Sequence, residues 1–184
     1  MRLSCLQENL AHALGVVGRA VATRTTLPIT QNILMTTDQS RLKLSATNLE
    51  IAISTWLGAQ IKEEGTLTVP ARLVTELVNS LPAERIDLDT SERSTSLAVR
   101  CARFNAKING ADAEDFPPIP SVESGLVGKV EPRVLSDAIV HVAFAAATDD
   151  SRPVLTGVKV EIAGDEFTMA GADGFRLAVY KDRL

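Results

Sequence analysis

Apolar residues recur along the first third of the chain with the two periods that distinguish helices from strands. A stripe at helical spacing predicts a helix over 7–18, because residues three and four apart share one face. Its members are Leu6, Leu10, Ala13, Leu14 and Val17. Apolar residues at alternating positions then predict three strands, over 32–37, 41–46 and 50–61.

The same order follows a second time. A polar turn at 62–65 leads into a short strand at 66–69 and, after Pro70, into an amphipathic helix over 71–81 that Pro82 stops. Three strands follow, over 86–89, 97–101 and 104–108. Two strand–helix–three-strand halves predict an α+β fold, a pseudo-twofold domain with both helices on one face of the sheets.

The chain also repeats itself at an offset of about 125 residues. Leu10, Ala13, Leu14 and Val17 recur as Leu135, Ala138, Ile139 and Val142, Pro28 as Pro153, and 46–53 as 172–179. A period this long indicates duplicated domains, since solenoid repeats run to roughly 20–50 residues. We therefore expect a complete domain at 1–110, an acidic, proline-rich linker at 111–124, and the first half of a second domain at 125–184, cut short at Leu184. In this second copy we expect a strand at 126–130, a helix from Pro132 to 144, and strands at 155–162 and from 167 into 179.

Composition narrows the function classes. The chain is 45% hydrophobic and 23% charged, as in ordinary globular proteins, and its net charge of −4 excludes a wholly basic nucleic-acid surface but leaves local positive faces open. Cys5 and Cys101 are unclustered, which favours reduced thiols in a cytoplasmic protein. No signal peptide is expected, and no apolar run approaches the roughly 20 residues that span a bilayer.

Six short stretches carry a resemblance to a known family. They are Thr25–Ile29, Ala46–Glu50, Val69–Arg72, Asp115–Pro117, Ser151–Val158 and Ala172–Ala178. In this order, without a large gap from Met1 to Leu184, they resemble the bacterial sliding clamp, the beta subunit of DNA polymerase III. One departure is Ala172, where many relatives carry threonine.

The resemblance implies the DNA clamp fold and a role in DNA replication. Clamps of this family have three similar domains and form a head-to-tail homodimeric ring that encircles duplex DNA without reading its sequence. They are non-catalytic processivity factors of a DNA-directed DNA polymerase. Short peptide motifs tether the replicative polymerase, the clamp loader and repair proteins to a hydrophobic cleft. No cofactor, metal or membrane partner is expected.

The resemblance also assigns roles to individual residues. It implies DNA contacts by Arg24, with Arg19 beside it, and offers Arg152, although Asp149 and Asp150 oppose a phosphate in that loop. One side of the peptide cleft would be Leu155, Ala172, Gly174, Phe175, Arg176 and Leu177, with the far wall supplied by residues after Leu184. The first-domain side of the ring interface would be Arg72, Glu76, Arg103, Phe104 and Ala106. Without the resemblance, Arg24 is equally well a solvated loop residue, and Asp173-Gly174 is a tight turn between strands.

Two other function classes remain open from the residues alone. One is a protein-interaction module without a DNA role, and the other, weaker, is a two-carboxylate hydrolase. The hydrolase would need acids from distant turns, at 63–64, 112–115 and 149–150, to converge in one pocket. His12 and His141 lack metal-ligand spacing, and no hydrolase, Walker or dinucleotide-binding motif occurs.

Overall fold

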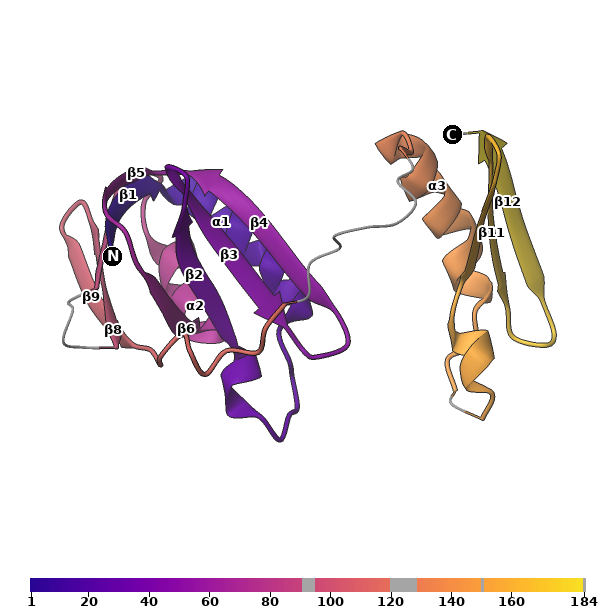
Figure 1. Cartoon of the computed structure of the whole chain (residues 1–184), viewed down its shortest axis with the longest axis horizontal. Helices are drawn as coiled ribbons and strands as arrows, with labels where there is room; N and C mark the ends of the chain where they lie inside the picture. Colours follow the sequence, from indigo (N-terminus) through magenta and orange to yellow (C-terminus); the bar gives the residue numbers. More distant parts are fainter. Residues whose placement is uncertain (91–94, 120–128, 150, 184) are drawn as a thin grey trace. The chain divides into compact units, whose positions relative to one another are not determined.

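The computed structural model describes residues 1–90, 95–119, 129–149 and 151–183 (Figure 1). The chain divides into two compact units, Met1–Ser121 and Val122–Leu184, here called unit 1 and unit 2. Among the described residues, no helix has the length and apolar character needed to cross a membrane.

Unit 1 consists of two halves with the same order of elements. The first half is β1 (Arg2–Leu6), α1 (Gln7–Val17), β2 (Asn32–Asp38), β3 (Arg41–Thr47), β4 (Ala52–Gly58) and β5 (Gln60–Glu63), with short 3-10 helices η1 (Gly18–Ala20) and η2 (Pro28–Gln31). The second half is β6 (Thr66–Pro70), α2 (Ala71–Ser80), β7 (Arg85–Thr90), β8 (Ser96–Cys101) and β9 (Phe104–Asn109). The predicted order is confirmed, except that the single strand expected over 50–61 is broken at Ala59 into β4 and β5.

The two halves exchange their first strands. The sheets run β4-β3-β2-β6 and β5-β1-β7-β8-β9, with antiparallel pairing throughout. Thus β6 of the second half completes the sheet of the first half, and β1 of the first half pairs with β7 of the second. This exchange makes the unit a pseudo-twofold domain whose halves cannot separate without breaking both sheets.

Helices α1 and α2 pack against each other and against the sheets (Figure 1). Leu10 and Leu14 of α1 and Val74 and Val78 of α2 are fully buried in one core cluster that contains no aromatic residue. Gln7 Nε2 donates a hydrogen bond of 2.7 Å to the carbonyl of Val78, so the start of α1 meets the end of α2. The prediction that both helices lie on one face of the sheets is confirmed.

The first residues of the predicted linker are part of unit 1. Thr68 and Ala111 form a bridge with backbone hydrogen bonds of 3.0 and 3.2 Å, and Phe116 is buried. At Gly110, a Cβ atom would lie 2.1 Å from the Thr68 carbonyl oxygen, so a larger residue cannot occupy this crossing. The remainder of the predicted linker, 120–124, lies outside the described residues.

Unit 2 has one helix on one three-stranded antiparallel sheet, in the order β10-β11-β12. Its elements are α3 (Pro132–Val142), η3 (Ala143–Ala145), η4 (Pro153–Thr156), β10 (Lys159–Ala163), β11 (Glu166–Ala172) and β12 (Leu177–Arg183). Glu131 caps α3, because its Oε2 accepts hydrogen bonds from the backbone N–H groups of Arg133 and Val134.

The core of unit 2 is small, with Ala138, Val142, Phe167 and Met169 as its buried members. The strand expected from 155 begins only at Lys159, because Pro153 starts a 3-10 turn. Most of the strand expected over 126–130 lies outside the described residues. Unit 2 therefore resembles one half of unit 1.

Replacing Leu14 by alanine tests the helix pair as the centre of unit 1. We expect the free energy of unfolding to fall by about 2–5 kcal/mol, since a fully buried leucine leaves a cavity. The control is Leu73→Ala on α2. The Leu73 side chain is 55% exposed, so we expect its loss to change the free energy of unfolding by less than about 1 kcal/mol. Urea unfolding followed by circular dichroism measures both; equal losses would place the core elsewhere.

Candidate functional site

A tight turn between β11 and β12 is organised by one carboxylate. Asp173 Oδ1 accepts hydrogen bonds of 2.9 Å from the backbone N–H groups of Phe175 and of Arg176. These bonds hold the pKa of Asp173 below its usual range, so the carboxylate is ionised at neutral pH. Gly174 has a φ of +93°, which a residue with a side chain rarely adopts. The Asp-Gly turn predicted here is confirmed.

Two arginines hold this turn. Arg152 Nη2 donates to the carbonyl of Asp173 at 3.3 Å, and its guanidinium nitrogens lie 2.9 Å from the position that a Cβ atom at residue 174 would take. Arg176 Nε lies 2.9 Å from Asp173 Oδ2, and its guanidinium carbon is 5.9 Å from the centre of the Phe144 ring. Glycine at 174 therefore lets Arg152 approach the backbone of the turn.

Beside the turn lies an apolar hollow of about 370 Å³. It is lined by Val154, Leu155, Gly157, Val158, Lys159, Ala170, Gly171, Ala172 and Leu177. Leu177 is 69% exposed, so an apolar ligand would find open hydrophobic surface here.

The structure brings together some of the residues that the resemblance assigned to a peptide cleft. Leu155, Ala172 and Leu177 line the hollow, while Gly174, Phe175 and Arg176 lie in the adjoining turn, with the Phe175 side chain 95% exposed. The other lining residues, among them Gly157, Ala170 and Gly171, were not predicted. Their sequence signal is weak: they are small residues close in sequence to Leu155 and Leu177. Small side chains leave room for a ligand but carry no group that would point to one.

Arg19 and Arg24 are both exposed in unit 1, in η1 and in the loop that follows it. Neither guanidinium has a hydrogen bond or ion pair with any residue that the structure describes. The loop after Arg24 is ordered by threonines: Thr25 Oγ1 accepts from the Leu27 N–H at 2.9 Å, and Thr30 Oγ1 donates to the Leu27 carbonyl at 2.8 Å. The two positive charges are thus free for an anionic partner.

Arg152 differs from this pair because it is engaged with the Asp173 turn. Near it, the Asp149 carboxylate accepts hydrogen bonds from the hydroxyl and the N–H of Ser151, and these bonds lower its pKa. The negative charge at Asp149 opposes phosphate binding in this loop, as the sequence suggested. Asp150 lies outside the described residues.

The residues assigned to a ring interface lie on α2, on β9 and in the turn between β8 and β9. Arg72 and Glu76 are exposed and form an ion pair of 2.8 Å one turn apart on α2. The Arg103 guanidinium lies 5.6 Å from the centre of the Phe104 ring, and Phe104 is 44% exposed. Ala106 is half-buried on β9, the last strand of its sheet. The outer edge of β9 is unpaired within that sheet.

Two carboxylates do share a cavity in unit 1, but both are paired. Asp87 and Asp89 line a space of about 470 Å³ with Arg2, Lys62 and Arg100 among its other members. Asp89 lies 3.3 Å from Arg2, and Asp87 lies 3.5 Å from Arg85. Such pairs suit a surface ion-pair network better than an acid–base couple. The described residues also contain no group of three potential metal ligands.

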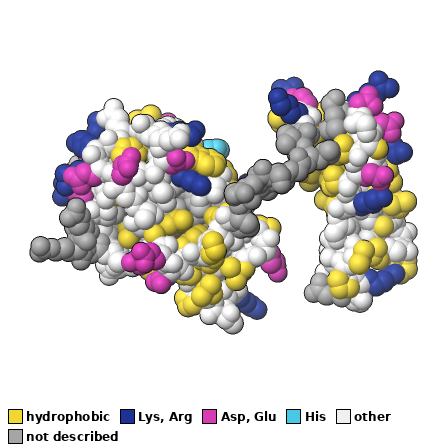
Figure 2. Space-filling view, viewed as in Figure 1, with side chains coloured by type: hydrophobic (Ala, Val, Ile, Leu, Met, Phe, Trp, Pro, Cys, Tyr) yellow, Lys and Arg dark blue, Asp and Glu magenta, His cyan; other side chains and the backbone are white. Residues whose placement is uncertain are grey.

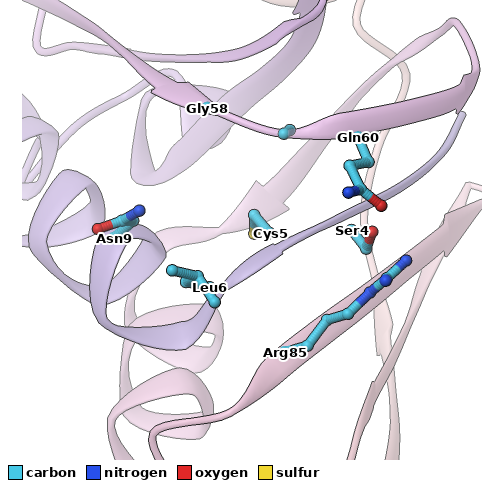
Figure 3. A pocket seen from close by; sticks show the side chains of 8 residues that line it. Ser4, Cys5, Leu6, Asn9, Gly58, Gln60 and Arg85 are labelled. Atoms are coloured by element: carbon cyan, nitrogen blue, oxygen red, sulfur yellow. The ribbon is translucent and has the colours of Figure 1, made fainter.

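A further cavity of about 290 Å³ lies where the start of α1 meets β1, β5 and β7 (Figure 3). Ser4, Cys5, Asn9, Gln60 and Arg85 are among its lining residues. Burial raises the pKa of the Cys5 thiol to about 12, with a smaller contribution from the Asp87 charge. The thiol therefore stays protonated at neutral pH and is a poor nucleophile.

Comparison with known proteins identifies the family to which the chain belongs. The family model described as DNA polymerase III beta subunit, N-terminal domain, matches residues 1–120, and the model for the central domain of the same subunit matches residues 129–184. Both matches fall in the order that the family has, and together they cover most of the chain.

Individual relatives agree. The beta sliding clamp of Synechocystis sp. is 35% identical over 97% of this chain and 48% of its own length, and that of Streptomyces coelicolor is 31% identical over 97% and 47%. Among solved structures, the Caulobacter crescentus DNA polymerase sliding clamp has a TM-score of 0.90 at 31% identity, covering 100% of this chain and 51% of its own. The Pseudomonas aeruginosa DNA polymerase III subunit beta has a TM-score of 0.92 at 29% identity, covering 100% and 50%. The chain spans about half the length of the curated relatives it matches.

The Cys5 thiol makes stability depend on alkaline pH. The pKa of this thiol is raised in the folded chain. Its contribution to the free energy of unfolding is therefore complete below the pKa of the unfolded chain, near 9, and is lost as the pH rises toward 12. From a pH of about 8 to about 10, we expect this group alone to lower the free energy of unfolding by about 1.4 kcal/mol. Urea unfolding of the native chain and of Cys5→Ala measures the difference, which should shrink by that amount.

Val99→Ala is the control, because it removes buried volume without removing a titrating group. A constant difference between the native chain and Cys5→Ala over this pH range would contradict the raised pKa.

Proposed function

The chain belongs to the DNA polymerase III beta subunit family, and we propose that it acts in a sliding clamp, the non-catalytic processivity factor of DNA replication. The observation that carries this proposal is the match of both domain models in family order along one chain. The clamp would work in the cytoplasm, around duplex DNA. An exposed arginine pair in unit 1 and an apolar hollow in unit 2 support the proposal.

A protein that slides along DNA must attract the phosphates without binding any of them for long. Binding of a nucleic acid strengthens with each neutralised phosphate, so a few free arginines give a modest attraction, whereas a dense basic surface would hold the protein in place. Arg19 and Arg24 provide such charges on a chain with a net charge of −4. The ring, and not affinity, then keeps the clamp on the duplex.

The hollow of unit 2 suits the apolar side chains of a short peptide tail. Leu155, Ala172 and Leu177 offer apolar surface, and each fully buried leucine- or phenylalanine-sized anchor contributes roughly 1.5–3 kcal/mol to binding. Arg176, which Asp173 and Phe144 hold at the turn, would frame the mouth of the cleft. We also assign Arg152 to this cleft, since it lies against Gly174. Polymerases, the clamp loader and repair proteins are the proposed partners.

Assembly into a head-to-tail ring would use the surface of α2 and β9. The unpaired edge of β9 can accept another strand. Phe104 lies on this strand, Arg103 in the turn before it, and the exposed Arg72 and Glu76 on α2. Strand edges of this kind are a common means of joining sheets between chains. The partner surface would come from the third domain that clamps of this family carry. Residues 1–184 by themselves, which match the N-terminal and central domain models, should therefore not close a two-chain ring.

Arg24→Ala tests the DNA role. Each phosphate contact contributes about 0.9 to the slope of log affinity against log salt concentration, so we expect that slope to become shallower by about this amount. Fluorescence anisotropy of a labelled duplex, at salt concentrations from low to physiological, gives the slope. Arg72→Ala is the matched control, because it removes an exposed arginine from α2. Equal slopes for all three proteins would exclude a phosphate contact by Arg24. Absence of duplex binding at low salt would favour the alternative, a protein-interaction module without a DNA role.

Leu177→Ala tests the peptide cleft. Calorimetric titration with a polymerase tail peptide should show a loss of about 5- to 30-fold in affinity, since the leucine loses part of its apolar contact. Gly174→Ala should also weaken binding, because its Cβ would displace Arg152. Val160→Ala is the control, an exposed residue outside the hollow.

The same peptide should bind this chain roughly 30- to 150-fold more weakly than it binds a full-length relative, as expected if a second wall completes the cleft there. Equal affinities would show that the second wall is unimportant. If Leu177→Ala leaves the affinity of the full-length protein unchanged, the peptide binds elsewhere.

A further inference from the structure

The cavity at the start of α1 lies in unit 1, where both halves of the domain are present (Figure 3). It opens where the chain passes from one sheet to the other. Strand β1 pairs with β5 only as far as Ser4 and Gln60, since the chain leaves the sheet of β4 at Ala59. Beyond this point no described strand pairs with β1 on that side, and a space of about 290 Å³ remains. Its volume is near the lower end of the range for small-molecule sites.

One buried hydroxyl in this cavity lacks a partner. Ser4 is 4% exposed, lines the cavity, and makes no side-chain hydrogen bond with any residue that the structure describes. Thr68 is its counterpart in the second half of unit 1, since both residues stand third in their strands, β1 and β6. Thr68 Oγ1 donates to the Ala111 carbonyl at 2.9 Å and accepts from Asn32 Nδ2 at 3.2 Å. Buried hydroxyls normally have such partners, so the Ser4 hydroxyl is available to a molecule in the cavity.

Ser4 shares one end of the cavity with two longer polar side chains (Figure 3). Gln60 is its neighbour on β5, and its carboxamide makes no hydrogen bond within the described part of the chain. Arg85 comes from β7, on the other side of β1. The Arg85 side chain is 51% exposed and lies 3.5 Å from Asp87, a pair too exposed to occupy the guanidinium fully. Arg85 is the one charged residue among those that line the cavity, so this end carries a positive charge beside two hydrogen-bonding groups.

The rest of the lining is uncharged and largely apolar. Cys5, Leu6 and Ala59 contribute to it, with Asn9 of α1 beside Leu6 (Figure 3). Gly58 adds no side chain, and a Cβ atom at its position would meet no atom within 4 Å. The Leu6 side chain is 56% exposed although it belongs to the first strand of a complete half. The cavity therefore combines a polar, positively charged end with an open apolar wall.

We propose that this cavity binds a small organic anion. Its carboxylate or phosphate group contacts Arg85, Ser4 and Gln60, and its apolar part lies against Leu6 and Ala59. Either group can accept hydrogen bonds from a guanidinium, a hydroxyl and an amide at once, and a bond to a charged partner is stronger than one between neutral groups. The site uses neither the arginine loop, nor the surface of α2 and β9, nor the hollow of unit 2, so the binding is independent of the clamp role.

Titration of the isotope-labelled chain, followed by nuclear magnetic resonance, tests the proposal with four probes. Phenyl phosphate and phenylacetate carry both parts of the proposed ligand, and the tighter of the two identifies the preferred anionic group. We expect saturable shifts of the amide signals of Leu6, Ala59 and Gln60 at millimolar concentrations, as is usual for ligands of this size. Benzyl alcohol lacks the charge and inorganic phosphate lacks the apolar part, so each should bind at least about fivefold more weakly.

Two variants separate recognition from folding. Arg85→Gln should weaken binding of the tighter probe by about tenfold or more, because it removes the charge-assisted hydrogen bond. Arg41→Gln is the matched control, an exposed arginine of β3 outside the cavity. Ser4→Ala should weaken binding by about threefold yet leave the urea midpoint unchanged, since its hydroxyl has no partner to lose among the described residues. Thr68→Val, which loses two hydrogen bonds, should lower that midpoint.

A cavity that holds only solvent would show no saturable shift with either organic anion, and this result would overturn the proposal. Benzyl alcohol that binds as tightly as the anions would do so as well, because the charge would then have no part in recognition. So would Arg85→Gln that binds the tighter probe like the native chain.

Discussion

The fold depends on one requirement, that the apolar face of each helix be covered by a second half. One helix on a three-stranded sheet buries a single stripe of side chains and leaves the neighbouring stripe open. In unit 1 this open stripe is closed when α1 and α2 meet, and the exchange of β1 and β6 between the sheets fixes the two halves in register. Burial of aliphatic surface supplies most of the stability of unit 1, since the cluster of described residues around α1 and α2 contains no aromatic side chain.

The same requirement also decides which surfaces of the units stay exposed. With the helices on one face, the outer faces and edges of the sheets remain available. The edge strand β9 and the hollow beside β11 and β12 are both products of this layout. The free arginines lie elsewhere, in and after η1, the short 3-10 helix that extends α1. Unit 1 therefore keeps its free arginines apart from its open strand edge, and the hollow belongs to unit 2.

Much of the fold was predictable because its signals are local. The helical stripe from Leu10 to Val17 and the prolines at 70 and 132 locate the helices, and the offset of 125 residues identifies the duplication. The break at Ala59 was not predictable, since the apolar alternation continues through it. The chain leaves one sheet for the other at that point, and only the pairing of β5 with β1 reveals this. The 3-10 turn at Pro153 likewise replaces residues that read equally well as strand.

The candidate site shows a similar division. The turn at Asp173 and Gly174 is recognisable from these two residue types alone. An aspartate carboxylate can accept hydrogen bonds from the backbone of a turn, and glycine readily adopts a positive φ. The sequence suggested a phosphate contact for Arg152, yet its guanidinium lies against Gly174, 22 positions later, where a hydrogen atom in place of a side chain makes room for it. Such a contact depends on how η4 and the β11–β12 turn approach each other, and no local pattern encodes that distance. The contact couples the loop that carries Asp149 to the wall of the hollow, so a substitution in either segment should be felt in the other.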